Sequence, residues 1–191
     1  MTGNKLDSKI IVQPRDLHLL SEIATLIDVD REMASVIAPF GSKTQAKQRL
    51  LELTRAGFLN RYFAGTIAGG RRAFYRLSAK GAALIGVPVH SPNRKQRDFS
   101  QGDLFLEHRM RVNSIFLFAK YRPIPHGLRV VRWCTFREPV SKSIGLIPDG
   151  YLEIECSGGT RSMFLEVDLG SETLDIWVRK TQRYLQFALT G

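Results

Sequence analysis

The chain has 191 residues, of which 43% are hydrophobic and 24% charged, and it carries a formal net charge of +10. This length suits one large or two small domains with apolar cores, and no apolar run approaches the ~20 residues that a membrane span requires. The basic excess belongs to the first half: residues 1–97 carry 16 basic and 7 acidic side chains, whereas residues 98–191 carry 12 and 11. This imbalance favours nucleic acid as a partner over a membrane surface.

The beginning of the chain does not have a signal-peptide pattern, so we expect a cytoplasmic protein with no membrane partner. Cys134 and Cys156 lack the spacing of a zinc or redox site and are expected to be reduced core residues. Prolines and basic residues interrupt all periodicity from Val87 to Asp103. We therefore predict a first domain at 1–87, a basic linker at 88–103 and a second domain at 104–191.

The first predicted domain has the pattern of a winged helix-turn-helix. Apolar spacing and turn signals predict three helices, two strands and a closing helix, over residues 15–26, 30–38, 42–56, 58–64, 73–77 and 79–85. Ser42 is expected to cap the third helix, and Gly57 to end it. Because Ala46, Leu50 and Leu53 face inward, the opposite side of that helix is expected to enter a major groove of double-stranded DNA.

Two sets of side chains are predicted to contact DNA. The third helix offers groups that reach base edges and phosphates, namely Lys43, Thr44, Gln45, Lys47, Gln48 and Arg49. The hairpin offers arginines that hold flanking phosphates, namely Arg61, Arg71, Arg72 and Arg76. Such binding requires no cofactor, and a homodimer on a two-fold site is expected. Each of these residues alone also fits a solvated surface, so the prediction depends on the agreement of helix, hairpin and charge.

The second predicted domain has the element order αβββα. Its helices and strands are expected over residues 104–120, 128–136, 151–156, 163–169 and 172–189. Asp149 precedes the second of these strands, and Glu166 lies in the third. The turn residues Ser157, Gly158 and Gly159 join the two strands as a hairpin, which brings Asp149 and Glu166 together on one side.

Carboxylates in this arrangement are typical ligands of Mg²⁺ or Mn²⁺, which activate water and neutralise charge on a phosphodiester. Asp149, Glu166 and Asp168 are therefore the candidate metal ligands. The same residues have a structural interpretation, because Asp-Gly pairs are common in turns and Glu-x-Asp is often a solvated strand end. Sequence alone leaves both interpretations open.

A family resemblance rests on segments spread over nearly the whole chain. They are Leu53–Leu59, Tyr75–Gly81, His108 with Val112 and Asn113, Pro148–Gly150, Phe164–Glu172, and Lys180 with Tyr184. Through them the chain resembles the replication-relaxation family of plasmid and mobile-element proteins. Its second half resembles the PD-(D/E)xK nuclease superfamily, which has the restriction-endonuclease-like fold. The stretch from Glu166 to Glu172, followed by Lys180 and Tyr184, is the most specific part.

The resemblance implies an α+β protein, with an N-terminal winged helix-turn-helix domain followed by an αβββα restriction-endonuclease-like domain. Active nucleases of the superfamily usually have a lysine two residues after the glutamate, where it stabilises the transition state. This chain has Asp168 at that position, so Lys180 would have to act as a displaced catalytic lysine beside Asp149, Glu166 and Asp168.

Three functions follow as hypotheses. The favoured one is a DNA-binding accessory or regulatory protein of a plasmid or mobile element, acting in replication, relaxation or transfer with a relaxase or replication protein as partner. Its nuclease-like domain would be degenerate and serve dimerisation or partner contact. The alternative is an active endonuclease that depends on Mg²⁺ or Mn²⁺. In a third hypothesis the second domain is purely an interaction module, and the first domain binds protein rather than DNA.

Overall fold

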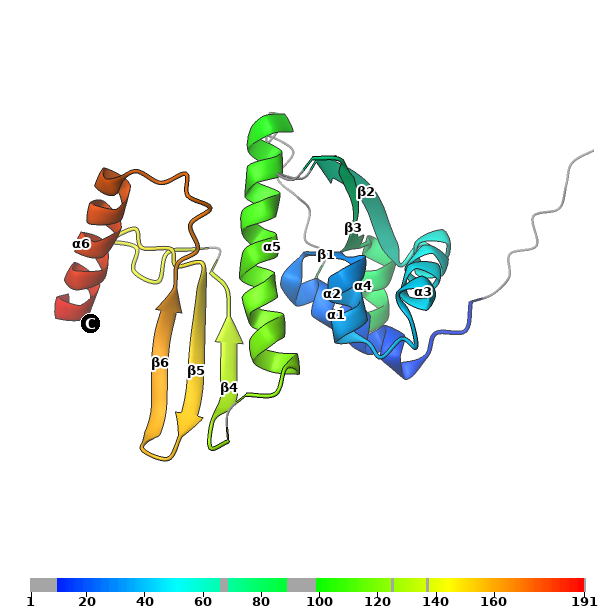
Figure 1. Cartoon of the computed structure of the whole chain (residues 1–191), viewed down its shortest axis with the longest axis horizontal. Coiled ribbons are helices and arrows are strands. Elements are labelled where there is room, and N and C mark those ends of the chain that lie inside the picture. The colour runs from blue at the N-terminus through cyan, green and yellow to red at the C-terminus, as the bar shows by residue number, and fades with distance from the viewer. Residues whose placement is uncertain (1–9, 66–68, 89–98, 125, 137, 191) are drawn as a thin grey trace, which may run out of the picture. The chain divides into compact units, whose positions relative to one another are not determined.

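The computed structural model describes residues 10–65, 69–88, 99–124, 126–136 and 138–190. Within these ranges the chain is an α+β protein with six helices and two three-stranded antiparallel sheets (Figure 1). Its internal contacts divide it into two compact units, Met1–Met110 and Arg111–Gly191. None of the helices in the described part of the chain has the length and apolar character needed to cross a membrane.

The first unit consists of helices around a small sheet. Its elements are α1 (Pro14–Leu26), β1 (Asp28–Asp30), α2 (Arg31–Ile37), α3 (Lys43–Arg55), β2 (Leu59–Gly65), β3 (Arg71–Leu77), α4 (Ala79–Ile85) and the first part of α5 (Phe99–Tyr121). Ser42 Oγ accepts a hydrogen bond from the backbone N–H of Gln45 at 3.2 Å, and Ser78 Oγ accepts one from that of Gly81 at 3.0 Å. These caps fix the beginnings of α3 and α4.

The core of the first unit comes from apolar side chains at helical spacing. Leu19, Leu20 and Ile23 of α1 and Leu50 and Leu53 of α3 are fully buried. Because residues three or four apart lie on one face of a helix, these side chains turn one stripe of each helix inward. The remaining faces of α1 and α3 are left for polar residues.

The sheet of the first unit has the order β1-β3-β2, with both pairs antiparallel. The hairpin of β2 and β3 agrees with the predicted pair of strands, but β1 was not predicted. Its three residues pair with β3, Asp28 opposite Arg76 and Asp30 opposite Phe74. A strand this short has no readable alternation, so the pairing with β3 is what defines it.

The second unit contains β4 (Arg129–Cys134), β5 (Gly150–Cys156), β6 (Gly159–Leu165) and α6 (Leu174–Thr190), in addition to the last part of α5. The sheet order is β4-β5-β6 (Figure 1). The predicted strand at 163–169 is wrong in its bounds, because β6 begins at Gly159, directly opposite Cys156. Its pairing is set by the tight turn after β5 rather than by the apolar run.

Aromatic side chains tie α6 to this sheet. The ring of Phe164 in β6 lies 5.7 Å from that of Tyr184 and 5.9 Å from that of Phe187. On the other strand of the hairpin, Tyr151 is 5.5 Å from Phe164. Offset and edge contacts of this kind add to the gain from apolar burial. They hold α6 beside the end of the β5–β6 pair.

The limits of the predicted domains stay a prediction. Helix α5 begins at Phe99, inside the segment predicted as a linker, and the division between the two units falls at Met110. Residues 89–98 of that segment lie outside the described residues. Cys134 and Cys156 are half-buried free cysteines.

Candidate functional site

One face of α3 presents most of the side chains that the sequence predicts to contact DNA. Lys43, Thr44, Gln45, Lys47 and Gln48 are all exposed. The side chain of Lys43 is 70% exposed although its ammonium pairs with Glu32 at 3.0 Å. Exposed lysines held only by such surface pairs remain free to exchange partners. This face is therefore a basic and amide-rich surface open to a ligand.

Arg49 lies on the same helix but points inward. Its guanidinium pairs with the fully buried Asp16 of α1 at 2.5 Å and donates to the backbone carbonyl of Ile11 at 2.7 Å. Only 12% of its side chain is exposed. The hydrogen bond to Asp16 raises the pKa of Arg49. The predicted DNA contact at Arg49 does not fit this arrangement, which instead joins α1 to α3.

The pairing register places the hairpin arginines on opposite faces of the sheet. Arg61 is opposite Tyr75, and Gly65 is opposite Arg71, so both arginines lie on one face. Arg72 and Arg76 lie on the other face. Arg61 and Arg71 are exposed, and the guanidinium of Arg61 lies over the ring of Phe63, 5.1 Å from its centre.

Two aspartates of β1 hold the arginines of the second face. Asp28 accepts two hydrogen bonds from Arg76, each 2.8 Å, and also pairs with Arg109 of α5. Asp30 pairs with Arg72 at 3.0 Å, and that arginine is still 49% exposed. Asp28 is fully buried and needs these partners, because an unpaired buried charge is costly. Arg76 therefore has a structural role, and Arg72 shares one.

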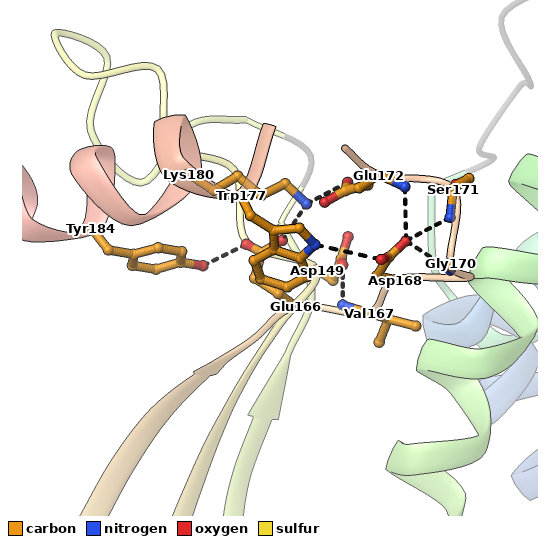
Figure 2. Close-up of polar contacts among 10 residues, drawn as sticks. All are labelled: Asp149, Glu166, Val167, Asp168, Gly170, Ser171, Glu172, Trp177, Lys180 and Tyr184. Carbon is orange, nitrogen blue, oxygen red and sulfur yellow. Dashed lines mark hydrogen bonds and ion pairs between the residues drawn. The ribbon is translucent and has the colours of Figure 1, made fainter. Parts of the chain in front are cut away.

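The second unit brings Asp149 and Glu166 together, as the sequence predicts. Gly150 and Leu165 are paired residues of β5 and β6. Asp149, directly before β5, and Glu166, directly after β6, therefore lie at the same end of that strand pair (Figure 2). The backbone N–H of Asp149 donates to the carbonyl of Leu165 at 3.0 Å. Gly150 starts β5 and is not a turn residue: a Cβ on it would come within 3.2 Å of the Trp133 ring.

Glu166 is the centre of a polar network with α6 (Figure 2). Lys180 Nζ donates to Glu166 Oε2 at 2.9 Å and to Glu172 Oε1 at 2.7 Å, and the Tyr184 hydroxyl donates to Glu166 Oε1 at 2.6 Å. The glutamate side chain is only 13% exposed. The family resemblance includes all four of these residues, and the structure connects them by hydrogen bonds.

The network shifts the titration of its members. Partial burial alone would lower the pKa of Lys180, but its hydrogen bonds to Glu172 and Glu166 raise it above its ordinary value. Burial, together with the hydrogen bond to Glu166 and the charge of nearby Asp149, raises the pKa of the Tyr184 phenol. Lys180 is thus charged and Tyr184 neutral near pH 7.

Asp168 does not join the other two predicted ligands. Its Oδ1 accepts hydrogen bonds from the backbone N–H groups of Gly170 and Ser171 at 2.9 and 3.1 Å, while its Oδ2 accepts one from Trp177 Nε1 at 3.5 Å. Although burial alone would raise its pKa, these bonds and that from the backbone N–H of Glu172 lower it. Asp168 organises the loop that leads into α6 (Figure 2).

These contacts do not fit a three-carboxylate metal site. Both oxygens of Glu166 already accept hydrogen bonds, and Asp149 Oδ2 accepts one from the backbone N–H of Val167 at 2.7 Å. Over the described ranges, no group of three or more His, Cys, Asp or Glu side chains is placed to hold a metal ion. Metal binding by Asp149 and Glu166 alone stays a prediction.

Sequence reasoning missed the acidic partners of the arginines. Asp16 is 33 residues from Arg49, and Asp28 is 48 residues from Arg76. Neither aspartate lies in a motif, and only the fold brings each to its arginine. The available signal is the pair Asp28 and Asp30 directly before α2, from which the sequence predicts only that a helix begins at Asp30.

Comparison with known proteins gives a match for most of the chain. The model of the replication-relaxation family matches residues 25–191, from the end of α1 to the last residue. Comparisons with curated proteins and with solved structures gave no match. Because the family match spans well over half of the sequence, the protein belongs to the replication-relaxation family.

Proposed function

We propose that this protein is a DNA-binding accessory or regulatory factor that serves the replication, relaxation or transfer of a plasmid or mobile element. The family supports a role in replication or relaxation. The observation that carries DNA binding is the exposed face of α3, with Lys43, Lys47 and Gln48. Lysine and glutamine reach phosphates and base edges when a helix enters the major groove.

The first unit is interpreted as a winged helix. Three helices precede a β-hairpin, and α3 is capped, amphipathic and followed directly by β2. In such a domain the hairpin holds the DNA backbone beside the reading helix. Arg61 and Arg71 suit this role because both are exposed on one face of the hairpin. Arg72 contributes from the opposite face, whereas Arg49 and Arg76 support the fold.

A binding titration tests this proposal. Fluorescence anisotropy with labelled duplex fragments of plasmid DNA at low salt should give saturable binding by the full chain. The Lys47→Ala, Arg71→Ala double variant should bind at least about tenfold more weakly, since two phosphate contacts are lost. The control is Lys142→Ala with Arg179→Ala, which removes the same charge from exposed positions of the second unit. Equal affinity of the two double variants would refute the assignment.

The second unit is interpreted as a nuclease-like domain used for contact with a second copy of the chain or with a relaxase or replication protein. Its helix α6 leaves a row of apolar side chains exposed, namely Leu174, Val178, Leu185 and Leu189. They recur at helical spacing on the side of α6 away from Tyr184 and Phe187. A homodimer through this row is consistent with a two-fold DNA site.

The endonuclease alternative requires a metal at Asp149 and Glu166. The contacts of Glu166 with Lys180 and Tyr184 do not favour it, because they occupy the oxygens that a metal would need. The alternative has a direct test. Nicking of supercoiled plasmid in Mg²⁺ or Mn²⁺ by the wild-type protein, abolished in Asp149→Ala, would establish it in place of the non-catalytic function.

A further inference from the structure

The polar cluster of the second unit contains its own cation. Glu166, Glu172 and Lys180 form two ion pairs, at 2.9 and 2.7 Å, through a single ammonium group. The Lys180 side chain is only 25% exposed, and the side chains of Glu166 and Glu172 are mostly buried as well. Ion pairs shielded in this way are stronger than surface pairs because water screens them less.

We propose that the Lys180 ammonium, and not a divalent metal, is the resident counter-cation of this carboxylate cluster, and that the second unit is therefore metal-independent. The inference does not rest on DNA binding, since no residue of the first unit takes part in it. The single positive charge of Lys180 is shared between the carboxylates of Glu166 and Glu172, and it neutralises one of their two negative charges. The neutral hydroxyl of Tyr184 donates a hydrogen bond to the other oxygen of Glu166, Oε1.

The hydrogen-bond inventory supports this assignment. An ionised carboxylate is acceptor-only and is stabilised when each oxygen has a donor. Glu166 accepts one hydrogen bond on each oxygen. Breaking either bond costs free energy, because a charge-assisted hydrogen bond at a mostly buried site is strong. A divalent ion would have to displace Lys180 and bring its own charge beside an ammonium that remains tethered to α6.

The cluster also shows where a metal would enter if Lys180 lost its charge. Glu172 Oε2 is buried and has no hydrogen-bond partner in the described part of the chain. Without Lys180, Glu166 Oε2 and Glu172 Oε1 would lose their donors too. Three oxygens from two carboxylates, with Asp149 nearby, then form a set of hard ligands suited to Mn²⁺. Removing the lysine charge should therefore create metal affinity.

The experiment is a Mn²⁺ titration of the full chain, followed by electron paramagnetic resonance of the free ion and by calorimetry. Wild type and Tyr184→Phe should show no saturable site, because both keep the ammonium. Lys180→Gln should gain a site that is about tenfold or more tighter than any wild-type binding. Lys142→Gln is the matched control, since it removes an exposed lysine of the same unit.

Two outcomes would overturn the proposal. One is saturable Mn²⁺ binding by the wild type that Asp149→Asn removes. The other is a folded Lys180→Gln variant that binds no more Mn²⁺ than Lys142→Gln does. Circular dichroism establishes whether Lys180→Gln folds. If it does not fold, the proposal is tested with the wild type and with Lys180→Arg. A saturable Mn²⁺ site in either protein that is lost when Asp149→Asn is added refutes the assignment.

Discussion

At the scale of single residues, the partner of each arginine decides its role. The guanidinium groups of Arg49 and Arg76 pair with the fully buried Asp16 and Asp28. The guanidinium of Arg61 instead lies over the exposed ring of Phe63. Removing either arginine would take a charged partner from a fully buried aspartate, so these pairs stabilise the fold whatever the domain binds. The sequence shows the charges of these residues but not their partners, which lie dozens of residues away.

Replacing Arg49 tests this division. Arg49→Met should lower the free energy of unfolding at pH 7 by about 3 kcal/mol, because it leaves the buried Asp16 carboxylate without its guanidinium partner and with only the backbone hydrogen bond from Gln13 among the contacts that the structure describes. The loss should be measured by urea denaturation followed by circular dichroism. Arg55→Met is the control, since Arg55 is an exposed residue of the same helix and its loss should be nearly neutral. Equal effects of the two substitutions would contradict a structural role for Arg49.

The same pair gives a prediction for pH. Burial alone would raise the pKa of Asp16, but hydrogen bonds from Arg49 and from the backbone of Gln13 lower it below its ordinary value of 3.8. A lowered folded-state pKa contributes stability above the ordinary value, which is lost as the pH falls through the folded value. The stability gap between wild type and Arg49→Met should therefore narrow below pH 3.8. A constant gap in urea titrations from neutral to acid pH would contradict this.

At the scale of elements, local chemistry explains which predictions succeeded. Helix α3 was predicted closely because Ser42, the cap expected from the sequence, also caps the helix in the structure. Helix α4 has the predicted bounds, and its cap, Ser78, is seen only in the structure. The strand predicted at 163–169 was placed too late in the chain. The pairing of β6 begins at the turn, whereas its apolar residues lie towards its end. Strand β1 was missed because a neighbouring strand, and not its own sequence, makes it extended. Asp149 and Glu166 were found because hairpin pairing is local.

Gly81 in α4 gives an element-scale prediction. An alanine in a helix normally adds stability over glycine, by roughly 1 kcal/mol. At this position a Cβ would lie 2.2 Å from the backbone oxygen of Phe58, which cannot move without disturbing β2. Gly81→Ala should therefore destabilise the first unit by about 1–3 kcal/mol.

Thermal and urea denaturation measure the effect. Gly158→Ala is the matched control, because a Cβ there meets no described atom within 4 Å. That variant should be close to wild type. A Gly81→Ala protein as stable as Gly158→Ala would mean that α4 can shift away from the hairpin, and that its contact with Phe58 does not fix its position.

At the scale of the whole molecule, the two halves of the chain differ in net charge. Residues 1–97 carry a net charge of +9 and residues 98–191 a net charge of +1, from 16 basic against 7 acidic side chains and 12 against 11. Among the described residues, six exposed basic side chains lie on α3 and the hairpin, namely Lys43, Lys47, Arg55, Arg61, Arg71 and Arg72. In the second unit, by contrast, Lys180 pairs with Glu166 and Glu172. DNA affinity should therefore depend on the first half of the chain.

Salt dependence tests that separation quantitatively. The slope of log affinity against log salt concentration reports the number of phosphates that a protein neutralises, at about 0.9 per phosphate on duplex DNA. Lys47→Ala with Arg71→Ala should reduce the slope by about 1.8, because each side chain is assigned one phosphate. The double control, Lys142→Ala with Arg179→Ala, should leave it unchanged. A variant that binds weakly with the full slope would show that these residues act through folding and do not touch the backbone of DNA.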